Sequence, residues 1–135
     1  MNIQESMHRI LADKDNVATL FYSIFFERYP EVKPYFEGVK LPHQAELLRM
    51  ALMVMEQHYS HNYPATDYYL KYLGTKHRAL GIPFDEYPKF GQALVATLEK
   101  FHGPDWNAQV ASQWQEAIDR TTRLLFEGYR TQYTV

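Results

Sequence analysis

Cysteine is absent from this chain of 135 residues, and its absence excludes several classes of site. Without thiolates the chain can hold no disulfide framework, no thiolate zinc site and no iron–sulfur cluster. Glycine is scarce, with 6 residues, and no glycine-rich loop of the kind that cradles a dinucleotide occurs. The lack of cysteine suits a reducing compartment, and we expect a cytoplasmic protein.

Long apolar runs and an excess of one charge are missing too. The most apolar stretches, LFYSIFF and ALMVM, are far too short to span a bilayer, and the N-terminus lacks the apolar run of a signal peptide. Lysine and arginine number 14 against 16 acidic residues, with no basic stripe that could follow a phosphate backbone. We therefore expect neither a membrane nor a nucleic acid as partner.

Apolar and aromatic residues in helical spacing make up much of the chain. Hydrophobic residues account for 46% and aromatic residues for 16%, enough for one core in a single domain spanning residues 1–135. Apolar residues recur every three or four positions, and alternation of period two is nowhere sustained. The pattern predicts an all-α fold of about seven helices, over residues 4–11, 15–29, 31–36, 43–63, 66–80, 84–101 and 107–129.

One predicted helix carries a histidine where the pattern calls for a hydrocarbon. Leu70, Leu73, His77 and Leu80 follow one another at steps of three, four and three, so they share one helix face. A polar ring on an apolar face needs a partner. The same helix has Thr66 or Asp67 as a candidate N-cap, and Gly81 is expected to end it.

Three further residues interrupt or border apolar faces elsewhere in the chain. Gln44 lies on the face of Leu48, Tyr22 shares a face with several phenylalanines, and Phe36 follows a proline-rich corner. An imidazole, an amide and a phenol among aliphatic walls describe a ligand pocket better than a plain core.

The order and spacing of these segments resemble a globin. The segments are FYSIFFERYPEVKPYF, HQAELLRMALMVM, KHRALGI, EYPKFGQALVATL and a last helix that bears a tryptophan. Over residues 10–129 the chain is most similar to the bacterial single-domain globins and to the haem domain of flavohaemoglobins. The resemblance implies a globin fold, a helical sandwich around one haem pocket, with haem b as the cofactor.

For the iron ligand, its neighbour and the packing against the haem, the resemblance implies roles for three residues. His77 matches the iron ligand, Phe36 the phenylalanine that packs against the haem, and Tyr87 the tyrosine beside the proximal histidine. The chain departs from the flavohaemoglobin pattern near the end of its last helix. Counting from the tryptophan puts Tyr129 where that group has a carboxylate, and Glu127 is turned away on the helix.

On the distal side, the resemblance implies that Tyr22 and Gln44 are polar groups facing the bound gas and that Leu48 is the apolar wall. A phenol or amide donor stabilises a gas that acquires negative charge, as O₂ does, more than one that does not, such as CO. A register shifted by one residue would instead bring His43 over the iron as a second ligand.

Several functions fit this set of residues. The first is reversible binding of O₂, with NO and CO as further ligands, for oxygen binding and transport or for scavenging of NO. The second is an enzyme, a nitric oxide dioxygenase working with a separate reductase. A third is a haem-based gas sensor. No catalytic residue is assigned, because gas binding alone requires none.

The remaining histidines receive structural interpretations. His58 and His61 stand three residues apart before a proline turn, and we expect a solvated helix end there, since no third metal ligand is evident. His8 and His102 lie near predicted helix ends, and we expect both on the surface.

Overall fold

The structure, a computed structural model, describes residues 1–13 and 16–134 and is helical almost throughout. No strand occurs in the described residues, so the predicted all-α fold is confirmed. Three segments are short 3-10 helices: η1 (Pro30–Phe36), η2 (Phe84–Glu86) and η3 (Gly103–Asp105). Six are α-helices: α1 (Ile3–Ala12), α2 (Asn16–Arg28), α3 (Leu41–His61), α4 (Pro64–Ala79), α5 (Tyr87–His102) and α6 (Ala108–Arg130).

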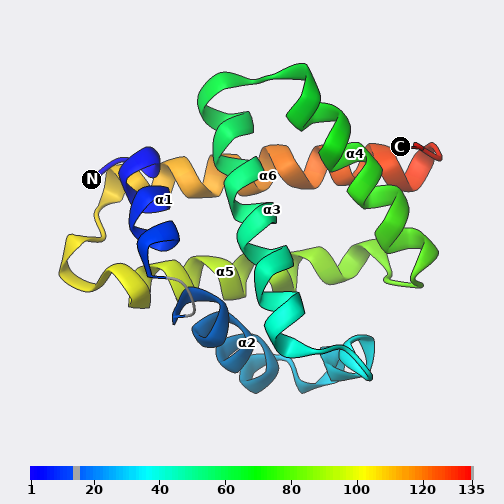
Figure 1. Ribbon diagram of the computed structural model, residues 1–135, viewed down its shortest axis with the longest axis horizontal. Helices are drawn as coiled ribbons and strands as arrows, with labels where there is room; N and C mark the ends of the chain where they lie inside the picture. The colour runs from blue at the N-terminus through cyan, green and yellow to red at the C-terminus, as the bar shows by residue number, and fades with distance from the viewer. Residues whose placement is uncertain (14–15, 135) are drawn as a thin grey trace.

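The two long C-terminal helices form the base on which the others pack. Helices α5 and α6 run antiparallel along the length of the molecule, and α3 crosses both of them (Figure 1). Helix α2 packs on α5, and α4 packs on α6. Helices α3 and α4 lie close together at their connecting turn and diverge from it, so that they form a V (Figure 1).

Most helix boundaries follow local sequence signals. Asn107 caps α6 through its side chain, which accepts from the Val110 N–H. Pro88 lies in the first turn of α5, where its missing N–H costs nothing, and the preceding residues form η2 instead of extending that helix. The predicted start of the second helix, Asp15, lies outside the described residues.

The predicted cap of α4 is wrong. The helix begins at Pro64, and its N-cap, Tyr63, makes no side-chain capping bond. Thr66 is inside the first turn, and its hydroxyl donates to the Tyr63 carbonyl at 2.7 Å. Proline at the first helical position has the backbone angle that a helix requires, so the helix starts before the polar residues that would otherwise cap it.

Two histidines that we expected on the surface are buried. His102 is 6% exposed, and its Nε2 lies 2.6 Å from the Ser6 hydroxyl, which also accepts from the Trp114 indole N–H at 2.9 Å. His58 is 6% exposed, with Nδ1 3.4 Å from the Thr66 hydroxyl. The expectation is therefore wrong for His58 and His102, whereas His8 and His61 are exposed as expected. A position near a helix end is no guide to burial when another helix packs over it.

The core lies where α2, α3, α5 and α6 meet. Its largest fully buried side chains include Phe21, Leu52, Leu94, Leu98 and Trp114. No helix in the described ranges combines the length and the hydropathy that crossing a membrane would require.

Candidate functional site

His77 lies in the last turn of α4, where backbone hydrogen bonds fix the conformation of the helix end. Gly81 has φ +81°, and its N–H donates to the Arg78 carbonyl at 3.0 Å. The Ile82 N–H donates to the His77 carbonyl at 3.1 Å. This pair of bonds is a Schellman motif, which requires a left-handed residue and so explains the glycine. The motif also reverses the direction of the chain, which brings the backbone of Ile82 close to that of His77.

The His77 side chain is partly buried and bonded through one nitrogen. Its Nδ1 lies 2.6 Å from the Tyr87 hydroxyl, and burial lowers the pKa of the imidazole to about 4, so the ring is neutral at pH 7. Within the part of the chain that the structure describes, Nε2 has no hydrogen-bond partner. One ring nitrogen of His77 is thus oriented by the protein, and the other is free to bind a ligand.

Behind His77 a row of hydroxyl groups continues to the backbone. The Tyr87 hydroxyl lies 3.4 Å from that of Tyr129, and Tyr129 donates to the Ile82 carbonyl at 2.6 Å. The rings of both tyrosines pack on Phe84. Burial, as the largest cause, raises the pKa of Tyr87 and of Tyr129, so both phenols are neutral at pH 7. The expected position of Tyr129 beside Tyr87 is confirmed.

Two glycines bring these residues together, and the sequence analysis missed both. An ideal Cβ on Gly74 of α4 would overlap the Leu125 carbonyl group of α6, and one on Gly128 would overlap the Lys71 carbonyl oxygen. The Thr75 hydroxyl donates to the Gly128 carbonyl at 2.8 Å, which holds the crossing. Both glycines lie inside long helices, where no turn requires them, and this was the available signal.

The second group of predicted residues surrounds Tyr22 of α2. This side chain is 7% exposed, and burial raises the pKa of its phenol to about 12, an effect that the neighbouring Gln44 amide partly offsets. The Tyr22 ring meets Phe36 of η1 edge-on, with centroids 5.6 Å apart. Leu48 belongs to the same apolar cluster and is 4% exposed.

Gln44 and the residue before it, His43, differ in how exposed their side chains are. His43 is exposed, whereas Gln44 is half-buried on the helix face that carries Leu48. The one-residue shift that would bring His43 inward therefore has no support in the geometry of α3.

The predicted residues form two groups on the two arms of the V. Tyr22, Phe36, Gln44 and Leu48 gather around the N-terminal half of α3, and His77 lies in the last turn of α4. These two helix ends lie at the open end of the V (Figure 1). The structure thus joins Tyr22 to Phe36 and His77 to Tyr87 by direct contact.

The residues present fit a haem better than a bare metal ion. No group of three histidine, cysteine or carboxylate side chains that could hold an ion occurs in residues 1–13 and 16–134. A lone imidazole holds an iron only when another molecule supplies the other ligands, as a porphyrin does. The unpartnered Nε2 and the neutral ring of His77 suit that role.

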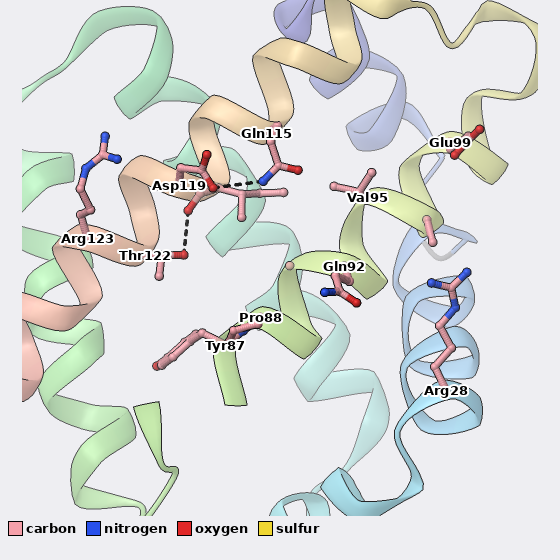
Figure 2. Close-up of a pocket in the computed structure, with 13 residues that line it drawn as sticks. Arg28, Tyr87, Pro88, Gln92, Val95, Glu99, Gln115, Asp119, Thr122 and Arg123 are labelled. Carbon is pink, nitrogen blue, oxygen red and sulfur yellow. Dashed lines mark hydrogen bonds between the residues drawn. The ribbon is translucent and has the colours of Figure 1, made fainter. Parts of the chain in front are cut away.

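A groove of about 770 Å³ lies elsewhere, between α5 and α6 (Figure 2). Its walls carry Gln92, Gln115, Asp119 and, at the ends, Arg28 and Arg123. Tyr87 alone among the predicted site residues lines it. The groove therefore adjoins the His77 group only at Tyr87, and none of the other predicted site residues lines it.

Comparisons with known proteins point to one family. A family model described as Globin matches residues 19–124. A protein named Flavohemoprotein from Bacillus thuringiensis subsp. konkukian is 31% identical over 121 residues, which cover 87% of this chain and 29% of that protein. A Flavohemoprotein from Candida albicans is 28% identical over 116 residues, covering 84% of this chain and 29% of that protein. The chain thus spans under a third of the length of these relatives.

Proposed function

Because the chain belongs to the globin family, we propose that it binds haem b through His77 and reversibly holds a diatomic gas, O₂ foremost. The observation that carries the proposal is the free Nε2 of a neutral, desolvated imidazole that the protein orients through Nδ1. Haem supplies an iron with one open coordination position for a gas.

Three residues, one of them from the group around Tyr22, hold and orient the cofactor. His77 offers its Nε2 lone pair to the iron, and the bond at Nδ1 fixes the plane of the ring. Phe36 presents an aromatic surface against which a porphyrin can pack. Tyr87 acts through His77 and does not touch the gas.

On the distal side, the residues determine which gas is bound more strongly. The Tyr22 phenol keeps its proton across the physiological range, because its pKa is raised to about 12, so it is a permanent donor. Gln44 adds a second donor, and Leu48 keeps water away. A donor stabilises O₂, which gains negative charge on binding, more than CO, and so favours O₂.

The test is the absorption spectrum of the purified protein with one equivalent of haemin, in the ferric and ferrous states and under O₂, CO and NO. We expect tight haem binding, a five-coordinate ferrous state and a stable O₂ adduct. A protein that refuses haemin contradicts the proposal.

A second candidate function is nitric oxide dioxygenation with a separate reductase. The similarity to proteins named Flavohemoprotein favours it, as does the pair of donors at Tyr22 and Gln44. Each conversion of O₂ and NO to nitrate consumes one electron, and these 135 residues contain no glycine-rich dinucleotide loop. We expect the chain alone to consume NO once per haem and to continue only when a reductase and NADPH are added. Sustained consumption with NADPH alone contradicts this assignment of the electron supply.

A further inference from the structure

The hydroxyl groups behind His77 form a row whose direction can be worked out from its last member. The row runs from His77 Nδ1 to Tyr87, on to Tyr129, and ends at the Ile82 carbonyl, with distances of 2.6, 3.4 and 2.6 Å. A backbone carbonyl only accepts hydrogen bonds. Tyr129 has one hydroxyl proton and donates it to Ile82, so it can only accept from Tyr87.

Two arrangements of protons remain, and they differ in the number of hydrogen bonds. If His77 donates from Nδ1 to Tyr87, then Tyr87 donates to Tyr129, and all three contacts carry a proton. If Tyr87 instead donates to Nδ1, the contact between the two phenols holds none, and the proton on Nε2 of His77 has no acceptor in the described part of the chain. The first arrangement makes three hydrogen bonds within the row and the second makes two, so the first is the stable one.

We propose that Tyr129 is a positioning residue that, with the Ile82 carbonyl, directs the hydroxyl row so that His77 carries its proton on Nδ1 and presents a neutral lone pair at Nε2. This inference rests on the proposed function only in what the lone pair binds. The tautomer itself is a property of the protein without cofactor.

The packing around Tyr129 supports such a role. The α4–α6 crossing at Gly74 and Gly128 puts this end of α6 beside His77, and the Arg78 guanidinium donates to the Tyr129 carbonyl at 2.7 Å. Phe84 packs edge-on against the Tyr129 ring, with 5.3 Å between centroids. Contacts of its backbone and of its ring therefore hold Tyr129 independently of its hydroxyl.

Because Tyr129 is neutral, it also affects how strongly His77 can donate electrons. A carboxylate accepting from Tyr87 would pull the imidazole proton away from Nδ1 and make His77 a stronger electron donor. The phenol of Tyr129 carries no negative charge, so it accepts more weakly than a carboxylate would, and its long 3.4 Å contact with Tyr87 agrees with this. His77 is thus a plain neutral imidazole ligand.

The tautomer is measured by ¹⁵N NMR of the histidine rings in the haem-free protein, with His77 assigned by its loss in a His77→Gln variant. We expect His77 to carry its proton on Nδ1 in the unmodified protein. In Tyr129→Phe, which keeps the ring but removes the acceptor, the Nε2–H form should become the major one. Tyr133→Phe is the control, because it removes a nearby phenol outside the row, and it should leave the tautomer unchanged.

An Nε2–H tautomer in the unmodified protein overturns the proposal, whatever the haem measurements give, and this spectrum decides even if Tyr129→Phe fails to fold. An Nδ1–H tautomer that survives in folded Tyr129→Phe overturns the role of Tyr129. In the haem-loaded protein, Tyr129→Glu should raise the iron–histidine stretching frequency and lower the reduction potential. Unchanged values of both overturn the argument on charge.

Discussion

A Cβ atom on Gly128 of α6 would lie 2.9 Å from the carbonyl carbon of Gly74 of α4. The two helices therefore cross at a point where neither can carry a side chain. The crossing lies one turn before His77 and one residue before Tyr129, so the geometry of the proximal group depends on it. It also connects the stability of the fold with the position of the candidate iron ligand.

Gly74→Ala tests this connection. The new methyl group meets backbone atoms of Leu125, which cannot rotate away, so the helices must separate. We expect a loss at or above the upper end of the about 1–3 kcal/mol typical of overpacking, measured by urea unfolding, together with weaker haem binding.

Gly91→Ala is the matched control for this prediction. A Cβ there would lie 3.3 Å from the Ile118 Cγ2 methyl group, which belongs to a side chain that can adjust. Because alanine suits a helix better than glycine by about 0.5–1 kcal/mol, the variant should stay within about 1 kcal/mol of the parent. Equal losses of stability in Gly74→Ala and Gly91→Ala would show that the α4–α6 crossing is packed no more tightly than the surroundings of Gly91.

Tyr22→Phe removes the distal donor and keeps the ring. A hydrogen bond to a charged acceptor contributes about 1.5–3 kcal/mol, and each 1.4 kcal/mol is about a tenfold change. O₂ should therefore dissociate about ten- to a hundredfold faster, measured by stopped flow, whereas CO dissociation changes far less. Tyr29→Phe, which removes a phenol that donates to Gln92 on the surface, is the control and should leave both rates unchanged. An unchanged O₂ rate in Tyr22→Phe would reduce Tyr22 to a packing residue.

Gln44→Leu and His43→Leu compare the two adjacent residues at the start of α3. Gln44 is half-buried beside Leu48 and Tyr22, and His43 is exposed. We expect Gln44→Leu to accelerate O₂ release and His43→Leu to change neither O₂ release nor the ferrous spectrum. A low-spin, six-coordinate ferrous protein that becomes five-coordinate in His43→Leu would reverse this assignment.

The stability of the haem-free protein should fall in mild acid because of buried His102. Burial lowers the pKa of this imidazole from 6.5 to about 4, so the folded state binds the proton more weakly than the unfolded chain does. His102 therefore contributes its full stability above about pH 6.5 and loses it progressively as the pH falls to about 4. His77 adds to the same trend in the same window.

Urea unfolding of the haem-free protein between pH 7.5 and 4 measures this effect. His102→Gln, whose amide can still reach Ser6, should make the dependence shallower by up to about 1.4 kcal/mol per pH unit. His61→Gln, at an exposed position, should leave it unchanged. A slope that is the same in His102→Gln as in the parent would exclude a role for this histidine.

The periodicity of the sequence was sufficient to predict the helices, and the resemblance to the globins was needed to predict the neighbours of His77. Neither predicted which residues from distant parts of the chain cover the helices. The count that led to Tyr129 agrees with the structure. The apolar face through His77 agrees only in part, because Leu70 is buried but Leu80 lies past the end of α4 and is 71% exposed. The burial of His102 by Ser6 and Trp114 joins residues about a hundred positions apart, and local spacing carries no information on such contacts. The same holds for Gly74 and Gly128, whose role appears only when two helices are docked.

The most direct test of the central claim, that His77 holds haem through a free Nε2, is haemin titration of His77→Gly with and without imidazole. We predict that the parent protein binds one haemin per chain and is five-coordinate when ferrous. His77→Gly should lose most of this binding, and added imidazole should restore it by taking the place of the missing ring. A His77→Gly protein that binds haemin as tightly as the parent, with the same ferrous spectrum and no response to imidazole, would contradict the account.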